Sequence, residues 1–251
     1  MDVFGLLFLL QFIWAASYGA MKIALAELEV THLGILRYAV ASVSMGAMML
    51  WRGCWKPFRG RTFLIVLSMA FFGNVISPIF GFSGVRLSRV SDVSILTSLE
   101  PLVTAALAFI ILREHFSKAK IFAVCIAIPG VLLLSEFSTD GGSAIAMRLL
   151  GNLLFLVALT CEAFYTVCSR NLADAIDPVR LSGWTFIGGV SLLSLFTVPV
   201  NGWPPVTQLS VKTWCAVIYL GLVCSAFAYT AWIWALRSVQ ANTAALPLYL
   251  Q

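Results

Sequence analysis

Long apolar runs, separated by short polar connections, dominate the pattern along the chain. A run of about 20 mostly apolar residues is long enough to cross a bilayer as a helix. The sequence contains eight runs of this kind and the start of a ninth. We expect spanning helices over roughly 4–26, 31–51, 62–84, 91–112, 119–135, 150–169, 180–199 and 213–236, with a last one opening near 241.

The composition supports an all-α integral membrane protein. Of the 251 residues 61% are hydrophobic and only 11% are charged, whereas soluble domains have about 25% charged residues. The six cysteines form no CxxC pair and the two histidines lie apart, so we expect no metal and no cofactor. No GxxxxGK[ST] motif occurs, so this chain should not hydrolyse ATP. The basic balance indicates loops facing a membrane rather than nucleic acid.

The basic residues indicate an orientation. Connections that follow even-numbered spans hold ten Lys and Arg residues, and those that follow odd-numbered spans hold four. By the positive-inside rule the N-terminus then lies in the cytoplasm. We expect a multi-pass protein of a bacterial cytoplasmic membrane, with the lipid bilayer and a small molecule as its partners.

The sequence contains a weak internal repeat. Residues 6–22 align without gaps to 153–169, and residues 90–100 align to 241–251. The first repeat then covers spans one to five (1–136), and the second covers 150–251. Because five is odd, the halves insert in opposite orientations, which is a common transporter architecture with the substrate site near the midplane. We therefore expect an inverted five-plus-five fold. Since Gln251 pairs with Glu100, we expect this chain to stop within its ninth helix.

Several segments resemble the EamA domain of the drug/metabolite transporter superfamily. The sequence LEPLVTAALAFIILREHFSKAKIFAVCIAIPGVLLL (99–134) resembles the end of that domain, IWAASYGAMKIA its first helix and ILRYAVASVSM its second. The matching positions are Trp14, Lys22, Arg37, Glu100, Pro101, Glu114 and Gly130. The resemblance implies a ten-helix exporter whose helices one, three, four, six, eight and nine line a central cavity. One departure is Trp184, which stands where the repeat would place a second copy of Arg37.

Glu100 and Pro101 lie inside an apolar run. A charge near mid-bilayer costs roughly 2.5–3.5 kcal/mol on insertion scales, so Glu100 should face the bundle interior. Pro101 removes a backbone donor and frees a carbonyl, which then needs water or a protein partner. Together they suggest a kinked helix that lines a hydrated cavity. The alternative is a buried, purely structural glutamate.

Other polar and aromatic residues recur at helical spacing in four spans and can enclose one pocket. They also have ordinary explanations, as hydrogen bonds between helices or interfacial aromatic residues. With Glu100, the candidates for the cavity are Gln11, Trp14, Tyr18, Asn74, Ser77, Glu162, Tyr165, Tyr229 and Trp232. Glu100 and Glu162 are candidates for proton coupling.

Four further residues have candidate roles. Pro78, Pro101 and Glu114 are assigned to a helix kink or gate. Arg37 has three candidate partners, Glu29, Glu27 or a substrate carboxylate, and it can also snorkel to the interface. We favour a structural ion pair for Arg37.

We therefore predict a secondary transporter that exports small metabolites such as amino acids, by alternating access through a central polar-aromatic cavity. The alternative is an integral-membrane enzyme acting on a lipid or isoprenoid carrier, although no acidic metal cluster or Ser/His pair is visible. A membrane assembly subunit is a third possibility.

Overall fold

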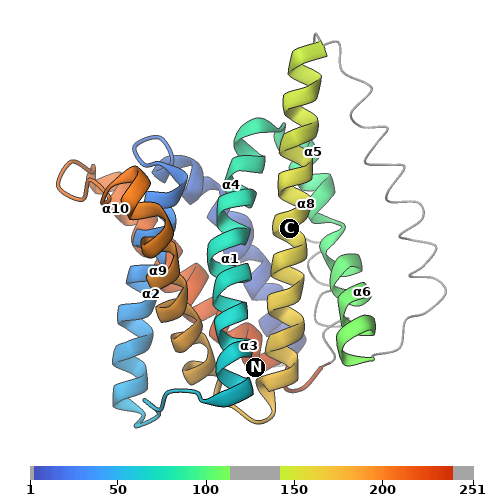
Figure 1. Ribbon diagram of the computed structural model, residues 1–251, viewed down its shortest axis with the longest axis vertical. Coiled ribbons are helices and arrows are strands. Elements are labelled where there is room, and N and C mark those ends of the chain that lie inside the picture. The colour runs from blue at the N-terminus through green and yellow to red at the C-terminus, as the bar shows by residue number, and fades with distance from the viewer. Residues whose placement is uncertain (1–2, 114–141, 240–251) are drawn as a thin grey trace.

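The computed structural model describes residues 3–113 and 142–239, and the elements in this part of the chain are all helices joined by short connections (Figure 1). Two segments, η1 and η2, are π-helical, with wider turns than the α-helices around them. The elements are α1 (Val3–Ala24), α2 (Val30–Trp51), α3 (Gly60–Phe71), η1 (Phe72–Ile76), α4 (Ser77–Leu87), α5 (Val90–Thr97), α6 (Glu100–Leu112), α8 (Gly142–Ala173), α9 (Pro178–Asn201), α10 (Val211–Ile218), η2 (Tyr219–Phe227) and α11 (Ala228–Ala235).

The described helices include seven runs long and apolar enough to cross a membrane. These runs are Val3–Ala24, Val30–Trp51, Gly60–Leu87, Ile95–Leu112, Ile145–Ala173, Pro178–Asn201 and Val211–Ala235. They confirm the all-α, multi-pass membrane class. The span predicted at 119–135, the one opening near 241, and Glu114 lie outside the described residues. The five-plus-five count therefore stays a prediction.

Contacts at both ends of the bundle show which way each helix runs. We call the end where α1 begins the near end and the opposite end the far end. At the far end Asn201 Nδ2 donates to Glu29 Oε2 at 3.0 Å. At the near end the Arg52 guanidinium lies 3.4 Å from the Asp177 carboxylate. The helices α2 and α9 therefore lie antiparallel to each other.

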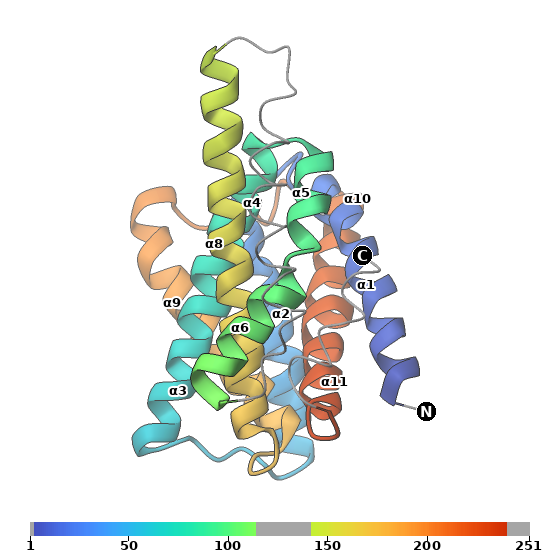
Figure 2. The ribbon, with the colours of Figure 1, turned by 90° about the vertical axis from the view of Figure 1, so that its right-hand side faces the viewer.

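The same reasoning places the other helices of the second half. The end of α4 meets α8 about a third of the way along α8, at the far end, where the Ser88 hydroxyl donates to Asn152. The last residue of α8, Ala173, accepts from Arg237 Nε at 2.8 Å near the end of α11. Figure 2 shows α8 running the whole length of the bundle beside α4 and α6. The first three spans of the second half thus run opposite to the first three of the first half.

The third span of each half deviates from α-helical geometry at a corresponding place. In the first half η1 interrupts the run from α3 to α4, and in the second half η2 interrupts the run from α10 to α11. The repeat alignments found in the sequence pair positions that are 147 or 151 residues apart. Adding either offset to the residues of η1 (72–76) gives positions that lie within η2. A π-turn bonds i to i+5 and is frequent at functional sites. Both π-segments precede residues that line the site described below.

Small residues let the two halves approach closely. A Cβ on Gly84 of α4 would lie 2.8 Å from the carbonyl oxygen of Gly151 of α8. A Cβ on Gly221 of η2 would lie 2.6 Å from Cβ of Val40 of α2. In membranes such close backbone contacts replace the hydrophobic driving force between helices. In both contacts a helix of the first half (α4 or α2) packs against a helix of the second half (α8 or η2).

A buried ion pair joins the halves at the far end. The Arg148 guanidinium of α8 contacts the Asp92 carboxylate of α5, with an Nη2–Oδ1 distance of 2.6 Å. Asn152 Nδ2 donates to the same carboxylate at 3.3 Å. The sequence pattern predicted the span to begin at 150 and left Arg148 in a connection. Instead α8 begins at Gly142, and Arg148 is buried on it because Asp92 neutralises its charge.

We expect Gly84→Ala to destabilise the protein by about 1–3 kcal/mol, the usual cost of forcing extra atoms into a packed interface. The matched control is Gly19→Ala in α1, where an added Cβ meets no heavy atom within 4 Å. That change should be neutral or stabilising by roughly 0.5–1 kcal/mol. Thermal unfolding of both variants in detergent micelles checks this. Equal midpoints would contradict the close α4–α8 contact.

Candidate functional site

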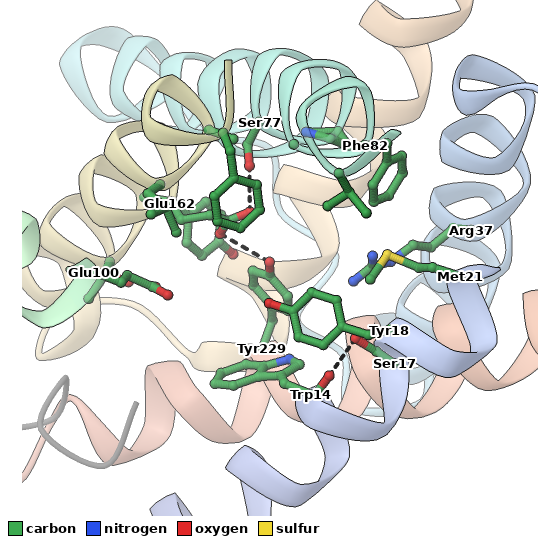
Figure 3. A pocket seen from close by; sticks show the side chains of 18 of the residues that line it. Trp14, Ser17, Tyr18, Met21, Arg37, Ser77, Phe82, Glu100, Glu162 and Tyr229 are labelled. Atoms are coloured by element: carbon green, nitrogen blue, oxygen red, sulfur yellow. Dashed lines mark hydrogen bonds between the residues drawn. The ribbon is translucent and has the colours of Figure 1, made fainter. Parts of the chain in front are cut away.

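A cavity of about 160 Å³ lies between the two halves of the bundle (Figure 3). Each half contributes both polar and apolar side chains to its walls. The lining comprises Trp14, Ser17, Tyr18 and Met21 of α1, Arg37 and Tyr38 of α2, Ser77, Pro78, Gly81, Phe82 and Val85 of α4, Glu100 of α6, Phe155, Ala158, Leu159, Glu162, Tyr165 and Thr166 of α8, and Tyr229 and Trp232 of α11.

The cavity extends from the middle of the bundle toward the far end. Met21 and Val85, which lie close to the far ends of α1 and α4, line it. On the near side, fully buried leucines such as Leu7, Leu10 and Leu181 fill the space between the helices. The site is therefore closed toward the near end by a packed apolar core.

One wall of the cavity carries two carboxyl groups. Glu162 of α8 accepts hydrogen bonds from both halves: the Ser77 hydroxyl donates to Oε1 at 2.8 Å, and the Tyr229 hydroxyl donates to Oε2 at 3.1 Å. Figure 3 shows Glu100 on the same side, turned toward the cavity. The carboxyl group of Glu100 makes no hydrogen bond within the described part of the chain.

A break in the fourth span positions Glu100. The helix α5 ends at Thr97, and α6 begins at Glu100 with Pro101 in its first turn. A proline there loses no helical hydrogen bond, because the first N–H groups of a helix have no partner within it. An acid in the first turn also interacts favourably with the helix dipole. The Glu-Pro pair therefore starts a second helix at the cavity, where the sequence predicted a kink.

Arg37 of α2 lies across the cavity from these carboxyl groups (Figure 3). Its Nε donates to the Ser225 hydroxyl at 2.8 Å. Ser225 is held by the π-helix η2, since its hydroxyl donates to the Leu220 carbonyl five residues earlier at 2.9 Å. The side chain of Arg37 is only 8% exposed.

The ion pair predicted for Arg37 is not formed within the described residues. Glu29 accepts from Asn201 instead. Glu27 accepts from the backbone N–H of Ser210 at 2.9 Å, and this bond holds the pKa of the Glu27 carboxyl below its usual range by stabilising the charged form. Eight residues of helix separate Glu29 from Arg37, which is about 12 Å along the axis. That distance explains why the acid and the arginine do not meet.

Aromatic rings pack edge to face beside the charged groups. Trp14 contacts Tyr229 and Trp232 with centroid distances of 5.9 and 5.4 Å. Tyr165 contacts Tyr229 at 5.3 Å. Edge-to-face geometry is preferred by aromatic pairs. The cluster connects α1, α8 and α11, and Figure 3 shows Trp14, Tyr18 and Tyr229 between Arg37 and Glu100.

Two predicted cavity residues lie elsewhere. Gln11 is buried, and its Nε2 donates to the Leu7 carbonyl at 3.1 Å on the near side. Asn74 is fully buried against α9, where its Nδ2 donates to the Thr185 carbonyl at 2.9 Å. The prediction assumed α-helical spacing from Asn74 to Ser77. The wider turn of η1 breaks that register, so the two side chains face different neighbours.

The cavity brings together the other eight predicted residues, Trp14, Tyr18, Ser77, Glu100, Glu162, Tyr165, Tyr229 and Trp232, and also Pro78. Sequence reasoning missed the apolar lining, and it favoured a structural ion pair for Arg37 over the substrate carboxylate that it also considered. Apolar lining such as Phe82 and Phe155 carries no signal in an apolar chain. The sequence did contain a signal for Arg37. The positions one helical turn away from it, 33, 34, 40 and 41, hold no acid that could form an ion pair within the helix.

A family model described as the EamA-like transporter family matches residues 3–136 and 149–251. The chain belongs to the EamA-like transporter family. An "Uncharacterized transporter" of Archaeoglobus fulgidus is 28% identical to this EamA-like chain over 98% of it and 83% of the relative. A "Probable terminal-alkyne amino-acid exporter" of Streptantibioticus cattleyicolor is 23% identical, covering 94% of this chain and 77% of that protein.

A solved crystal structure shares the fold of this EamA-like protein. It superposes with a TM-score of 0.72 at 18% identity, covering 98% of this chain and 82% of the other. The family match confirms the resemblance seen in the sequence. It also favours membrane transport of a small molecule over the membrane-enzyme alternative.

Thiol labelling should separate cavity residues from buried ones. In a background without the six native cysteines, we expect Glu100→Cys to react with a small membrane-impermeant maleimide. Gln11→Cys, at a buried position outside the cavity, should stay unlabelled until the protein is denatured. Mass spectrometry of the labelled protein measures both. Equal labelling of the two positions would contradict the cavity described here.

Proposed function

We propose that this protein is a secondary transporter that exports small metabolites such as amino acids by alternating access. The observation that carries the proposal is the cavity at the junction of two oppositely oriented halves. Inverted repeats with a midplane site between them are the usual architecture of such transporters. Here polar contacts at the cavity connect the halves, as in the bonds from Ser77 to Glu162 and from Arg37 to Ser225.

The cavity suits a small metabolite. Its volume is about 160 Å³, and an apolar cavity of roughly 150 Å³ holds benzene. Pockets for drug-sized ligands run from about 300 to 1,000 Å³. The mixture of charged, hydroxyl and aromatic groups favours an amphipathic molecule. The name of the amino-acid exporter related to this chain points to the same class.

We assign the near end to the cytoplasm, following the distribution of basic residues, in a bacterial cytoplasmic membrane. The cavity then extends toward the outer side, while the apolar core around Leu7, Leu10 and Leu181 closes the cytoplasmic side. Export requires a second state in which these near-side contacts separate and the far-side contacts close.

Glu100 and Glu162 are the groups that we assign to proton coupling. Ionisable side chains inside the membrane are costly and commonly mark proton or substrate pathways. Both carboxyl groups line the cavity. Since no nucleotide-binding motif is present in the sequence, the proton gradient or the substrate gradient would supply the energy.

Transport assays in proteoliposomes test the function. We expect labelled leucine or phenylalanine to accumulate when a proton gradient is imposed, and Glu162→Gln and Glu100→Gln to abolish the gradient-driven part. The matched control is Glu29→Gln, which changes a carboxylate bonded to Asn201 outside the cavity and should transport normally.

Each outcome has a separate meaning. Flux that persists unchanged in both cavity variants would refute the proposed coupling role but not transport. Absence of flux from folded wild-type protein, for every amino acid tried, would refute amino acids as the substrate class.

A further inference from the structure

Arg37 presents an unused set of hydrogen-bond donors to the cavity. A guanidinium has five N–H donors. In the described part of the chain only Nε has a partner, the Ser225 hydroxyl. Figure 3 shows the terminal nitrogens turned toward the cavity. Its two terminal NH2 groups, with four N–H donors, therefore have no partner within the described residues and lie beside the space that a transported molecule would occupy.

Within the described residues no carboxylate lies within ion-pair distance of Arg37, and Glu162 across the cavity is the acid that interacts with its charge. Among the described residues Arg37 is in no ion pair, and Glu27 and Glu29 are bonded to other groups. A buried charge without a counterion is strongly unfavourable. The planar fork of a guanidinium matches a carboxylate in two parallel hydrogen bonds. The carboxylate of a bound molecule therefore both neutralises the charge of Arg37 and fits the planar arrangement of its N–H donors.

Tyr38 of the same helix and Tyr229 and Glu162 of the second half are near the Arg37 guanidinium, and none of them accepts a hydrogen bond from it. The Tyr38 ring lies 5.6 Å from the guanidinium carbon. The Glu162 oxygens already accept from Ser77 and Tyr229. Glu162 and Glu100 form the opposite wall of the cavity. An anion bound at Arg37 therefore uses donors that neither glutamate occupies.

The charge pattern across the cavity is asymmetric. Within the described lining Arg37 is the only Lys or Arg side chain. The position that the repeat alignment equates with Arg37 is Trp184, whose ring packs on Trp55 with a centroid distance of 5.4 Å. A ligand with one negative and one positive group therefore has a single orientation that suits both walls.

We propose that Arg37 binds the carboxylate of the transported molecule, and that Glu100 and Glu162 face its ammonium group. This inference rests on the proposed function and narrows its substrate class to small zwitterions with an α-amino and a carboxylate group. The apolar lining, including Met21, Phe82 and Leu159, contacts the side chain of the substrate. Ser225 is a positioning residue, because it orients Arg37 through η2 without facing the substrate.

Ligand binding to the purified full chain in detergent tests the proposal. Three related compounds separate the contact with the carboxylate from the contact with the ammonium group. They are leucine, leucinamide, which lacks the carboxylate, and 4-methylpentanoate, which lacks the ammonium group. The unfolding midpoint at increasing ligand concentration measures each affinity. Phenylalanine, phenylalaninamide and 3-phenylpropanoate form a second series with a larger side chain.

We expect leucine or phenylalanine to bind wild-type protein about ten- to a hundredfold more tightly than its amide, the range that a charge-assisted hydrogen-bond pair contributes. Arg37→Gln should remove this preference, and Arg37→Lys should retain part of it. Ser225→Ala should weaken binding of the amino acid more than binding of the amide. The matched control is Arg52→Gln, which changes the near end of the same helix and should bind like wild type.

The outcomes separate this inference from the proposed function. Equal binding of acid and amide by wild-type protein, or an unchanged preference in Arg37→Gln, overturns the role of Arg37. If Arg37→Gln does not fold, Arg37→Lys and Ser225→Ala decide the question by the same comparison. Tight, Arg37-dependent binding without flux in proteoliposomes supports the inference and refutes transport of these amino acids. Folded wild-type protein that binds neither series overturns the zwitterion class.

Discussion

The cost of placing charge and polar groups inside a bilayer governs this structure. Glu100, Glu162 and Arg37 all lie within membrane-spanning helices, and lipid offers no partner for them. The two halves enclose these residues around a common cavity and supply hydroxyl partners to two of them, Ser77 and Tyr229 to Glu162 and Ser225 to Arg37. The arrangement of the remaining helices follows from the need to surround this polar centre with protein.

Enclosure requires the halves to meet closely, and small residues make that possible. Gly84 meets the backbone of Gly151, and Gly221 meets Val40, at distances that no larger residue permits. At the far end the Asp92–Arg148 ion pair adds a polar connection between the halves. Transporters of inverted-repeat architecture work by moving one part against another around a fixed site. Membership of the EamA-like family and the central cavity are both consistent with that mode of action.

The two π-segments show how local geometry prepares the site. At η2 the wider turn lets the Ser225 hydroxyl reach back to Leu220 and accept from Arg37. At η1 it turns Asn74 toward α9 while Ser77 faces Glu162. A helical wheel with 3.6 residues per turn places Asn74 and Ser77 together, so the pattern of residues alone misassigns Asn74. The corresponding position of η1 and η2 also shows the repeat more clearly than the few identical residues do.

The sequence by itself determined the membrane class and the seven described spans, because long apolar runs are distinctive. It also pointed to most of the polar residues that line the cavity, because polar residues stand out against an apolar background. Trp14, Glu100 and Glu162 were accessible to such reasoning for that reason. Only the tertiary structure decided which partner each charge meets. Arg37 and Glu29 are close in sequence, yet helix geometry separates them and Ser225, 188 residues away, bonds to Arg37 instead. Such pairings depend on how distant helices pack, which no local pattern encodes.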